Sequence, residues 1–169
     1  FVIQNREFKS VTGSFNNKRI SVISTGIGGS NIDIVINEVD ALFNYDFTNQ
    51  CYKTKHVSLN FIRIGTSGSI SENIEVNSHL ISEYAIDLNS QLSFYNLDNY
   101  KSDNIDIISF ENLNLNCFRS SRELFEKFYS NNLVKGLTAT CNGFYAFQGR
   151  KTRIPLDNSI NLEKLNRIL

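Results

Sequence analysis

The sequence predicts a mixed α/β fold with a largely parallel central sheet flanked by helices. The prediction rests on the order of neighbouring patterns in the first 70 residues. Residues 19–25 have the composition of a strand, a glycine-rich turn follows at residues 26–30, and an amphipathic helix begins at about Asn31. A second strand-like run occupies residues 59–70. Strand, turn, helix and strand in this order are typical of a β-α-β unit.

The helix after the glycine turn carries one apolar stripe. Its apolar residues recur at intervals of three and four, which places them on one helix face; they are Ile32, Val35, Ile36, Val39, Leu42 and Phe43. Ser30 or Asn31 is suited to be the N-cap, because a short polar side chain accepts a hydrogen bond from the first turn.

Further strands and helices are expected along the chain. Residues 13–18 carry hairpin-turn residues, and residues 78–86 and 134–141 have the pattern of strands. Ser120 to Glu123 resembles a helix start, with Leu124, Phe125 and Phe128 as the apolar face.

The polar stretches are predicted to lie at the surface. Residues 44–58 are expected to form a surface loop or a short hairpin, and residues 88–116 to be irregular with room for one short strand. Residues 163–169 have the pattern of a beginning helix. The default expectation for His56, His79 and Glu83 is a surface position.

Composition limits the class of protein. The chain has 169 residues, 41% of them hydrophobic and 12% aromatic, which excludes a disordered tail and suits a single domain over residues 1–169. Lys plus Arg and Asp plus Glu number 17 each, so we expect no nucleic-acid or membrane partner. Cys51, Cys117 and Cys141 lack metal-ligand spacing, so we expect no metal site and reduced thiols in a cytoplasmic protein. Because the sequence opens at Phe1 and has no methionine, we expect the middle part of a longer chain.

The run at residues 59–70 carries the first candidate binding residues. Arg63 is embedded among Phe61, Ile62 and Ile64, and burial of a guanidinium requires an anionic partner. Residues 65–68, Gly-Thr-Ser-Gly, offer hydroxyls and accessible backbone N–H groups, so the segment could hold a phosphate. The alternative is a surface arginine before an ordinary turn, and this segment alone slightly favours that alternative.

The glycine turn at residues 25–30 is weaker. Asn31 stands where a dinucleotide-binding fingerprint has its third glycine, which argues against that class of domain. An anion site at the helix N-terminus and a plain tight turn both remain open.

A second candidate site is the loop at residues 142–150. Gln148 and Arg150 are two apart, so in an extended segment their side chains project to the same side. An amide and a guanidinium suit a ligand edge with acceptors and a donor. The alternative is a polar surface loop with an aromatic anchor.

Four segments together resemble the uridine phosphorylases, in the nucleoside phosphorylase family whose members also act on purine nucleosides. They are Asn5-Arg6-Glu7-Phe8, residues 24–29 (Ser-Thr-Gly-Ile-Gly-Gly), residues 63–68 (Arg-Ile-Gly-Thr-Ser-Gly) and residues 144–150 (Phe-Tyr-Ala-Phe-Gln-Gly-Arg). The resemblance implies the family's fold and covers most of the chain. It departs from the family at Ser30, where a proline is common, and in the longer segment at residues 44–58. The family's first phosphate loop and its Glu-Met-Glu ribose segment are absent from this sequence.

The resemblance implies a phosphate site. Arg63 and Thr66 resemble residues that hold phosphate, and Thr66 also lies beside the ribose. Arg6 resembles an arginine that reaches the neighbouring subunit's phosphate site, which implies a homodimer or a hexamer built as a trimer of dimers. Glu7, with the Ile27 backbone, resembles a monovalent-cation site between subunits, a fainter match. No other cofactor is implied, and inorganic phosphate is the co-substrate.

The resemblance also implies a base site. Gly68 lies where the base stacks on backbone, and Phe144 resembles the aromatic residue packed against the nucleoside. Gln148 and Arg150 resemble the pair that hydrogen-bonds uracil, with Arg150 acting in catalysis beside Arg63 and Thr66.

The implied reaction is phosphorolysis of a pyrimidine nucleoside such as uridine to the free base and ribose 1-phosphate, in nucleoside salvage. The rivals are a purine nucleoside phosphorylase, a nucleosidase that uses water, and a non-catalytic nucleoside-binding protein. The Gln-x-Arg pair argues against the purine enzyme, and Arg63 against the nucleosidase.

Overall fold

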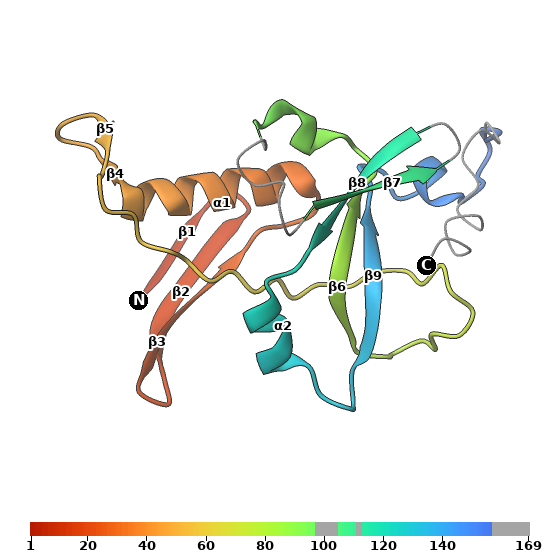
Figure 1. The fold of residues 1–169 in the computed structure, drawn as a ribbon, viewed down its shortest axis with the longest axis horizontal. Coiled ribbons are helices and arrows are strands. Elements are labelled where there is room, and N and C mark those ends of the chain that lie inside the picture. The colour runs from red at the N-terminus through yellow and green to blue at the C-terminus, as the bar shows by residue number, and fades with distance from the viewer. Residues whose placement is uncertain (97–104, 111–112, 157–169) are drawn as a thin grey trace. The chain divides into compact units, whose positions relative to one another are not determined.

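The computed structural model describes residues 1–96, 105–110 and 113–156 (Figure 1). The chain divides into two compact units, residues 1–64 and residues 65–169. Each unit has its own sheet, so they are described in turn.

The first unit is built on a three-stranded antiparallel sheet. Strands β1 (Val2–Asn5), β2 (Phe8–Phe15) and β3 (Lys18–Ser24) follow one another in the order β1-β2-β3. The β2–β3 turn is Asn16-Asn17, with φ angles of 47° and 62°. Two positive φ values suit a two-residue hairpin turn, and asparagine tolerates them better than most residues. The hairpin turn predicted at residues 13–18 and the strand predicted at residues 19–25 are both confirmed.

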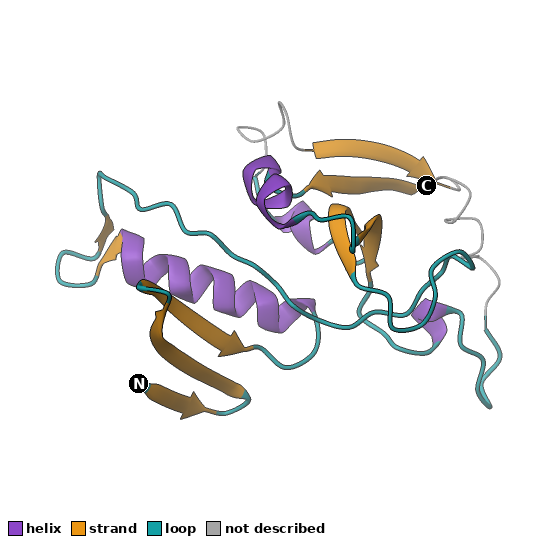
Figure 2. Cartoon of the chain, turned by 90° about the horizontal axis from the view of Figure 1, so that it is seen from below, coloured by secondary structure: helices purple, strands orange, loops and turns teal. Residues whose placement is uncertain are grey.

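Helix α1 (Gly29–Asn44) lies against one face of this sheet (Figure 2). Apolar side chains of the sheet and of the helix line a shallow hollow of about 210 Å³ between them; among them are Ile3, Phe8, Ile23, Val35, Val39 and Leu42. The predicted helix is confirmed, and Val35, Val39 and Leu42 of its predicted stripe line this hollow, whereas Ile36 and Phe43 are exposed. The N-cap prediction was wrong, because Gly28, with φ 103°, caps the helix without a side-chain bond. The glycine lets the helix begin earlier and leaves Ser30 and Asn31 inside its first turn.

The end of α1 is held by a buried asparagine. Asn44 is 5% exposed, and its Nδ2 donates to Oδ1 of Asp40 (2.7 Å) and to the carbonyl oxygen of Val57 (3.2 Å). Its Oδ1 accepts from the Val57 N–H at 2.7 Å. Strands β4 (Tyr45–Asp46) and β5 (Cys51–Tyr52) form a short hairpin directly after it, as one of the two predictions for residues 44–58 required.

The strand predicted at residues 59–70 is absent. Residues 59–69 have no regular secondary structure, and no described strand pairs with them. The apolar residues expected to be buried are exposed, with 57% for Ile62 and 93% for Ile64. High β-propensity reflects packing between neighbouring strands, so an apolar run without a hydrogen-bonded neighbour does not form a strand.

The second unit contains a four-stranded sheet. Strands β6 (Leu80–Asp87), β7 (Ile105–Phe110), β8 (Leu113–Arg119) and β9 (Val134–Thr140) lie in the order β7-β8-β6-β9. The mixed α/β class is confirmed. Among the described strands β6 and β9 pair in parallel and the other pairs are antiparallel. The two-residue connections β1–β2 and β2–β3 explain much of this, since so short a link joins only antiparallel strands.

Of the other predictions for this unit, two strands and a helix are confirmed and one irregular segment is not. The strands predicted at residues 78–86 and 134–141 are confirmed as β6 and β9. The predicted helix is α2 (Arg122–Phe128), whose N-cap Ser121 accepts from the Leu124 N–H at 3.4 Å. The expectation for residues 88–116 was wrong, because they include β7, β8 and the 3₁₀ turn η1 (Gln91–Phe94). Asn and Asp are depleted in strands generally, yet pairing between neighbouring strands overrides this preference. Residues 163–169 lie outside the described residues.

Two of the described apolar side chains in the second unit are almost fully buried. Ile86 on β6 and Cys117 on β8 are 1% and 2% exposed. They are surrounded by partly buried Tyr84, Leu88, Leu137 and Ala139. The three cysteines form no disulfide with one another.

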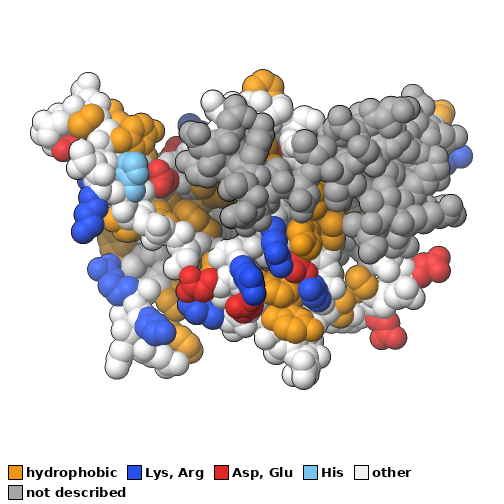
Figure 3. All heavy atoms as spheres, in the orientation of Figure 1, with side chains coloured by type: hydrophobic (Ala, Val, Ile, Leu, Met, Phe, Trp, Pro, Cys, Tyr) orange, Lys and Arg blue, Asp and Glu red, His pale blue; other side chains and the backbone are white. Residues whose placement is uncertain are grey.

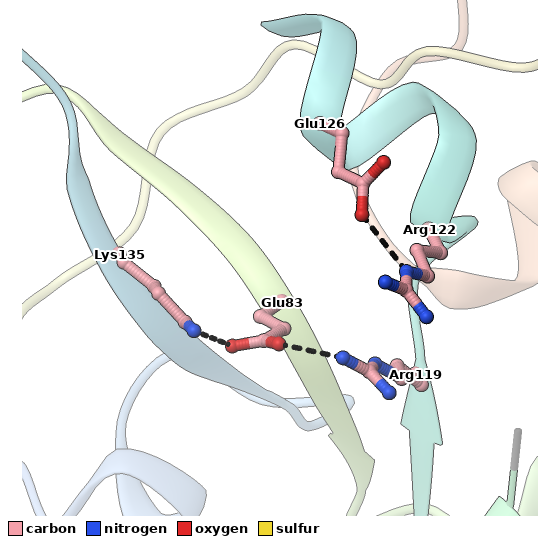
Figure 4. Close-up of polar contacts among 5 residues, drawn as sticks. All are labelled: Glu83, Arg119, Arg122, Glu126 and Lys135. Carbon is pink, nitrogen blue, oxygen red and sulfur yellow. Dashed lines mark hydrogen bonds and ion pairs between the residues drawn. The ribbon is translucent and has the colours of Figure 1, made fainter. Parts of the chain in front are cut away.

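Glu83 links three elements of this sheet. Its carboxylate pairs with Arg119 at the end of β8 (3.0 Å) and with Lys135 on β9 (2.5 Å), as Figure 4 shows. The side chain is only 12% exposed, so the predicted surface position was wrong, whereas His56 and His79 are exposed as expected. The β6–β9 register shifts at Glu83, between the pairs Ser82–Gly136 and Tyr84–Leu137. Such a bulge changes the direction of a side chain, here toward its two cations.

We expect the contribution of Glu83 to stability to fade in acid. Hydrogen bonds from Lys135 and then from Arg119 hold the pKa of the Glu83 carboxyl below its usual value of 4.5. A carboxyl with a lowered folded-state pKa stabilises the fold above its unfolded pKa and loses this effect as the pH falls through the folded value. Thermal unfolding should therefore show a Tm gap between wild type and Glu83→Gln at pH 7 that narrows below pH 4.5. A gap independent of pH would contradict this prediction.

The surface carries both kinds of charge. Basic and acidic side chains are interspersed on the face drawn in Figure 3, as equal numbers of the two lead one to expect. Within the described ranges, no helix is both long and apolar enough to cross a membrane.

Candidate active site

The first unit presents Arg6 and Glu7 at a hairpin tip. These two residues form the turn between β1 and β2, and Arg6 has φ 53°. Arginine rarely adopts this left-handed conformation, so the turn stores backbone strain of order 1 kcal/mol. Both residues are exposed. Arg6 is therefore accessible to another molecule.

The same unit brings Glu7 to the glycine turn. A methyl group added at Gly26, where φ is 68°, would lie 3.7 Å from Cγ of Glu7 and 3.1 Å from Nδ2 of Asn31. Glu7 thus lies beside the start of α1, together with Asn31, which sequence reasoning had treated only as a possible cap. Across the described residues, no group of three or more His, Cys, Asp or Glu side chains could hold a metal ion.

Arg63 is placed differently from the prediction. It lies in the irregular run before the second unit, it is exposed, and none of the described carboxylates pairs with it. The argument that a buried guanidinium demands an anion therefore does not apply in this structure. What remains is an accessible arginine with five N–H donors.

The second unit begins with Thr66 and Gly68 in an exposed irregular segment. Gly68 lies next to Arg150, because a methyl group at Gly68 would be 3.5 Å from Nη2 of Arg150. Two predicted base-site residues that are 82 positions apart in the sequence are therefore neighbours in space.

Arg150 is positioned by the turn that precedes it. The 3₁₀ turn η3 (Ala146–Gln148) ends at Gly149, whose φ is 68°. The Arg150 N–H donates to the Tyr145 carbonyl (2.8 Å), and the Gly149 N–H donates to the Ala146 carbonyl (3.0 Å). These two bonds around a left-handed glycine form a Schellman motif. The expectation of an extended segment with Gln148 and Arg150 on one side was wrong, because Gly149 reverses the chain between them.

Phe144 and its aromatic neighbours are open to solvent. Phe144, Tyr145 and Phe147 are 52%, 62% and 52% exposed, and Gln148 is half-buried. A Cβ at Gly143 would be 2.7 Å from Cδ2 of Phe147, so a larger residue there would displace the Phe147 ring. The loop therefore offers an apolar surface beside the Arg150 backbone. Sequence reasoning missed the role of the Tyr145 carbonyl, which accepts from both the Gln148 and the Arg150 N–H groups.

The structure thus divides the predicted site residues between the two units. Gly68 and Arg150 meet in the second unit, which also carries Thr66, Phe144 and Gln148. Arg6, Glu7 and Arg63 belong to the first unit.

The chain belongs to the Phosphorylase superfamily, whose sequence profile matches residues 1–162. This is the superfamily of nucleoside phosphorylases, and its membership confirms the family resemblance of the four segments.

Relatives with both pyrimidine and purine names are similar to this chain. A uridine phosphorylase of Thermococcus kodakarensis is 27% identical over 86% of this chain and 44% of its own length. A uridine phosphorylase of Haemophilus influenzae is 36% identical over 52% of this chain and 29% of its own. A DeoD-type purine nucleoside phosphorylase of Bacillus thuringiensis is 33% identical over 57% of this chain and 37% of its own. The chain therefore spans less than half the length of these relatives.

The fold also matches a solved structure. A Trypanosoma brucei nucleoside phosphorylase, described as showing uridine phosphorylase activity, superposes with a TM-score of 0.67 at 20% identity. The match covers 90% of this chain and 58% of that one, and it shows that the two share a fold.

Proposed function

We propose that the protein containing this chain catalyses phosphorolysis of pyrimidine nucleosides, converting uridine and phosphate to uracil and ribose 1-phosphate. The observation that carries the proposal is the closeness of two distant motif residues in a member of this superfamily, since a methyl group at Gly68 would lie 3.5 Å from Nη2 of Arg150. The relatives named uridine phosphorylase support the pyrimidine substrate.

Phosphate would be held by Arg63 and Thr66 and by Arg6 from a neighbouring copy of the chain. Arg6 is exposed at a hairpin tip, and Arg63 has no carboxylate partner within the described residues, so both have donors available for an anion. Phosphate held close to the anomeric carbon makes the attack effectively unimolecular, which supplies much of the acceleration. The shared Arg6 requires at least a homodimer, and a hexamer of three dimers satisfies the same requirement. Glu7 beside Gly26 would hold a monovalent cation between subunits.

The base would lie against Gly68 and Phe144, with Gln148 and Arg150 at its edge. As the glycosidic bond breaks, the sugar becomes oxocarbenium-like and negative charge moves onto the pyrimidine. The Arg150 guanidinium binds this developing charge more tightly than the neutral base, which is what acceleration requires. The Schellman motif supports the role, because it fixes the Arg150 backbone before substrate arrives.

A purine nucleoside phosphorylase is the second candidate, since the DeoD-type relative is named for purine substrates. The two candidates differ in the ligand edge that Gln148 and Arg150 must meet.

The decisive experiment measures base release by the full-length protein with uridine, thymidine and inosine, each with and without phosphate. We expect phosphate-dependent release of uracil from uridine. Turnover of inosine alone would replace the pyrimidine assignment with the purine one, and release without phosphate would indicate a nucleosidase. Binding of uracil without any turnover would indicate a non-catalytic nucleoside-binding protein.

A further inference from the structure

A charged depression of about 310 Å³ lies in the second unit and includes the Glu83 ion pairs described above. Three cations and two carboxylates face it, with one hydroxyl in its wall; these residues are Arg119, Arg122, Lys135, Glu83, Glu126 and Ser120. None of them is among the predicted phosphate or base residues. With three cations and two carboxylates, the charged side chains of the depression carry a net charge of +1.

Two of the cations share one carboxylate. Glu83 is bonded to Nη2 of Arg119 at 3.0 Å and to Nζ of Lys135 at 2.5 Å. Each cation is thereby held in place with only one of its hydrogens used in these bonds. Arg119 and Lys135 remain 38% and 51% exposed, so their other donors are open to a ligand.

The third cation is held only loosely. Nε of Arg122 pairs with Oε1 of Glu126 at 2.8 Å on the same helix, and both side chains are largely exposed, at 79% and 62%. An exposed pair at this helical spacing contributes little to stability, so Arg122 can turn to another anion at small cost. Figure 4 shows this pair on α2 and the Glu83 pairs on the strands.

The wall contains a polar atom without a partner. Oγ of Ser120 is shielded from water and forms no hydrogen bond to any described residue. Buried hydroxyls are normally hydrogen-bonded, so Ser120 has a donor that no described residue uses.

We propose that this depression binds the phosphate group of a small molecule. A phosphate group has several acceptor oxygens. They match the donors of the depression, which are two guanidinium groups, one ammonium group and the Ser120 hydroxyl. Because the Phe125 ring beside them already contacts Tyr129 (5.6 Å between centroids) and Lys135 (5.7 Å), recognition is directed at the anion rather than at a stacked ring.

The depression is separate from the predicted base residues of the same unit. Lys135 is the second residue of β9, whereas Phe144 to Arg150 follow the other end of that strand. A strand of this length places its two ends about 20 Å apart. A phosphate bound at Lys135 would therefore lie at the opposite end of β9 from the point where the loop with Phe144 and Arg150 begins, and it would act as a second ligand.

The test is titration of the full-length protein with inorganic phosphate at constant ionic strength, followed by amide chemical shifts in NMR spectra. We expect the amides of Ser120 and Arg122 to shift in wild type and equally in an Arg63→Ala background, which removes the predicted reaction site. Arg122→Gln should weaken this binding about tenfold, the effect of one charge-assisted hydrogen bond. Glu126→Gln should strengthen it, because Arg122 loses its competing partner.

Lys127→Gln is the matched control, since Lys127 is exposed on the same helix but pairs with Glu123 and does not line the depression. It should leave the affinity unchanged. The proposal is overturned if the Ser120 and Arg122 amides do not respond to phosphate, if Lys127→Gln weakens binding as much as Arg122→Gln, or if Glu126→Gln fails to strengthen it.

A parallel titration with phenyl phosphate identifies the natural source of the phosphate group. Tighter binding than that of inorganic phosphate would assign the site to a phosphate monoester. Equal or weaker binding would assign it to inorganic phosphate itself.

Discussion

Replacing Arg150 with alanine should lower uridine phosphorolysis by the full-length protein by a factor on the order of 10² to 10³ in kcat. Nη2 of Arg150 would lie 3.5 Å from a methyl group at Gly68, where the base is proposed to lie, and in the proposed reaction the guanidinium stabilises charge that appears only as the glycosidic bond breaks. Removing a donor of this kind affects the transition state more than the bound substrate. The measurement is steady-state kinetics with uridine at saturating phosphate.

Arg153→Ala is the control for this variant. Arg153 is an exposed arginine three residues further along, so its loss changes the net charge equally without touching Gly68. The control should retain wild-type kcat, and both variants should unfold at the wild-type temperature because neither arginine pairs with a described carboxylate. Normal turnover in Arg150→Ala would refute the proposed role of the loop.

Local signals predicted the helices well. The apolar stripe of α1 and the Ser-Ser-Arg-Glu start of α2 are patterns contained within a few consecutive turns, and both helices formed as expected. The run at residues 59–64 has equally strong strand composition, yet it has no regular structure. The difference is physical, because a helix satisfies its hydrogen bonds internally, whereas a strand needs a neighbour that its own sequence does not specify.

Pairwise contacts over long sequence separations were harder to predict. The motif resemblance grouped Gly68 with Arg150 as base-site residues, and the structure places the two near each other, although nothing in either segment alone indicates this. No such motif covers Glu83, Arg119 and Lys135, so the charge pairs between residues 36 and 52 positions apart were missed. The signal in the sequence was Glu83 within an apolar strand. A partly buried carboxylate requires cations nearby, so this pattern indicates a charge pair.

Asn44→Leu should destabilise the protein by about 1 to 3 kcal/mol, the usual cost of leaving buried polar groups without partners. Leucine has a similar volume but cannot accept from the Val57 N–H or donate to its carbonyl, and Asp40 also loses its bond. The Asn44 side chain bonds both backbone groups of Val57, as a neighbouring strand would do. Loss of the Asn44 amide should therefore also detach the segment at residue 57 from α1. Chemical denaturation gives the free energy of unfolding, and hydrogen exchange at the Val57 amide reports the local effect.

Asn37→Leu separates this role from a general effect of leucine on the helix. Asn37 lies on the same helix and also bonds back to the residue four positions earlier, with its Nδ2 2.9 Å from the Asp33 carbonyl oxygen, but it is exposed. Water can take over a hydrogen bond at an exposed position, so this variant should remain within about 0.5 kcal/mol of wild type. Equal losses in the two variants would mean that the α1 surface, rather than the buried Asn44 contact with Val57, determines stability here. A large loss of unfolding free energy in Asn44→Leu alone, with faster hydrogen exchange at the Val57 amide, would show that the buried Asn44 amide attaches the segment at residue 57 to the end of α1.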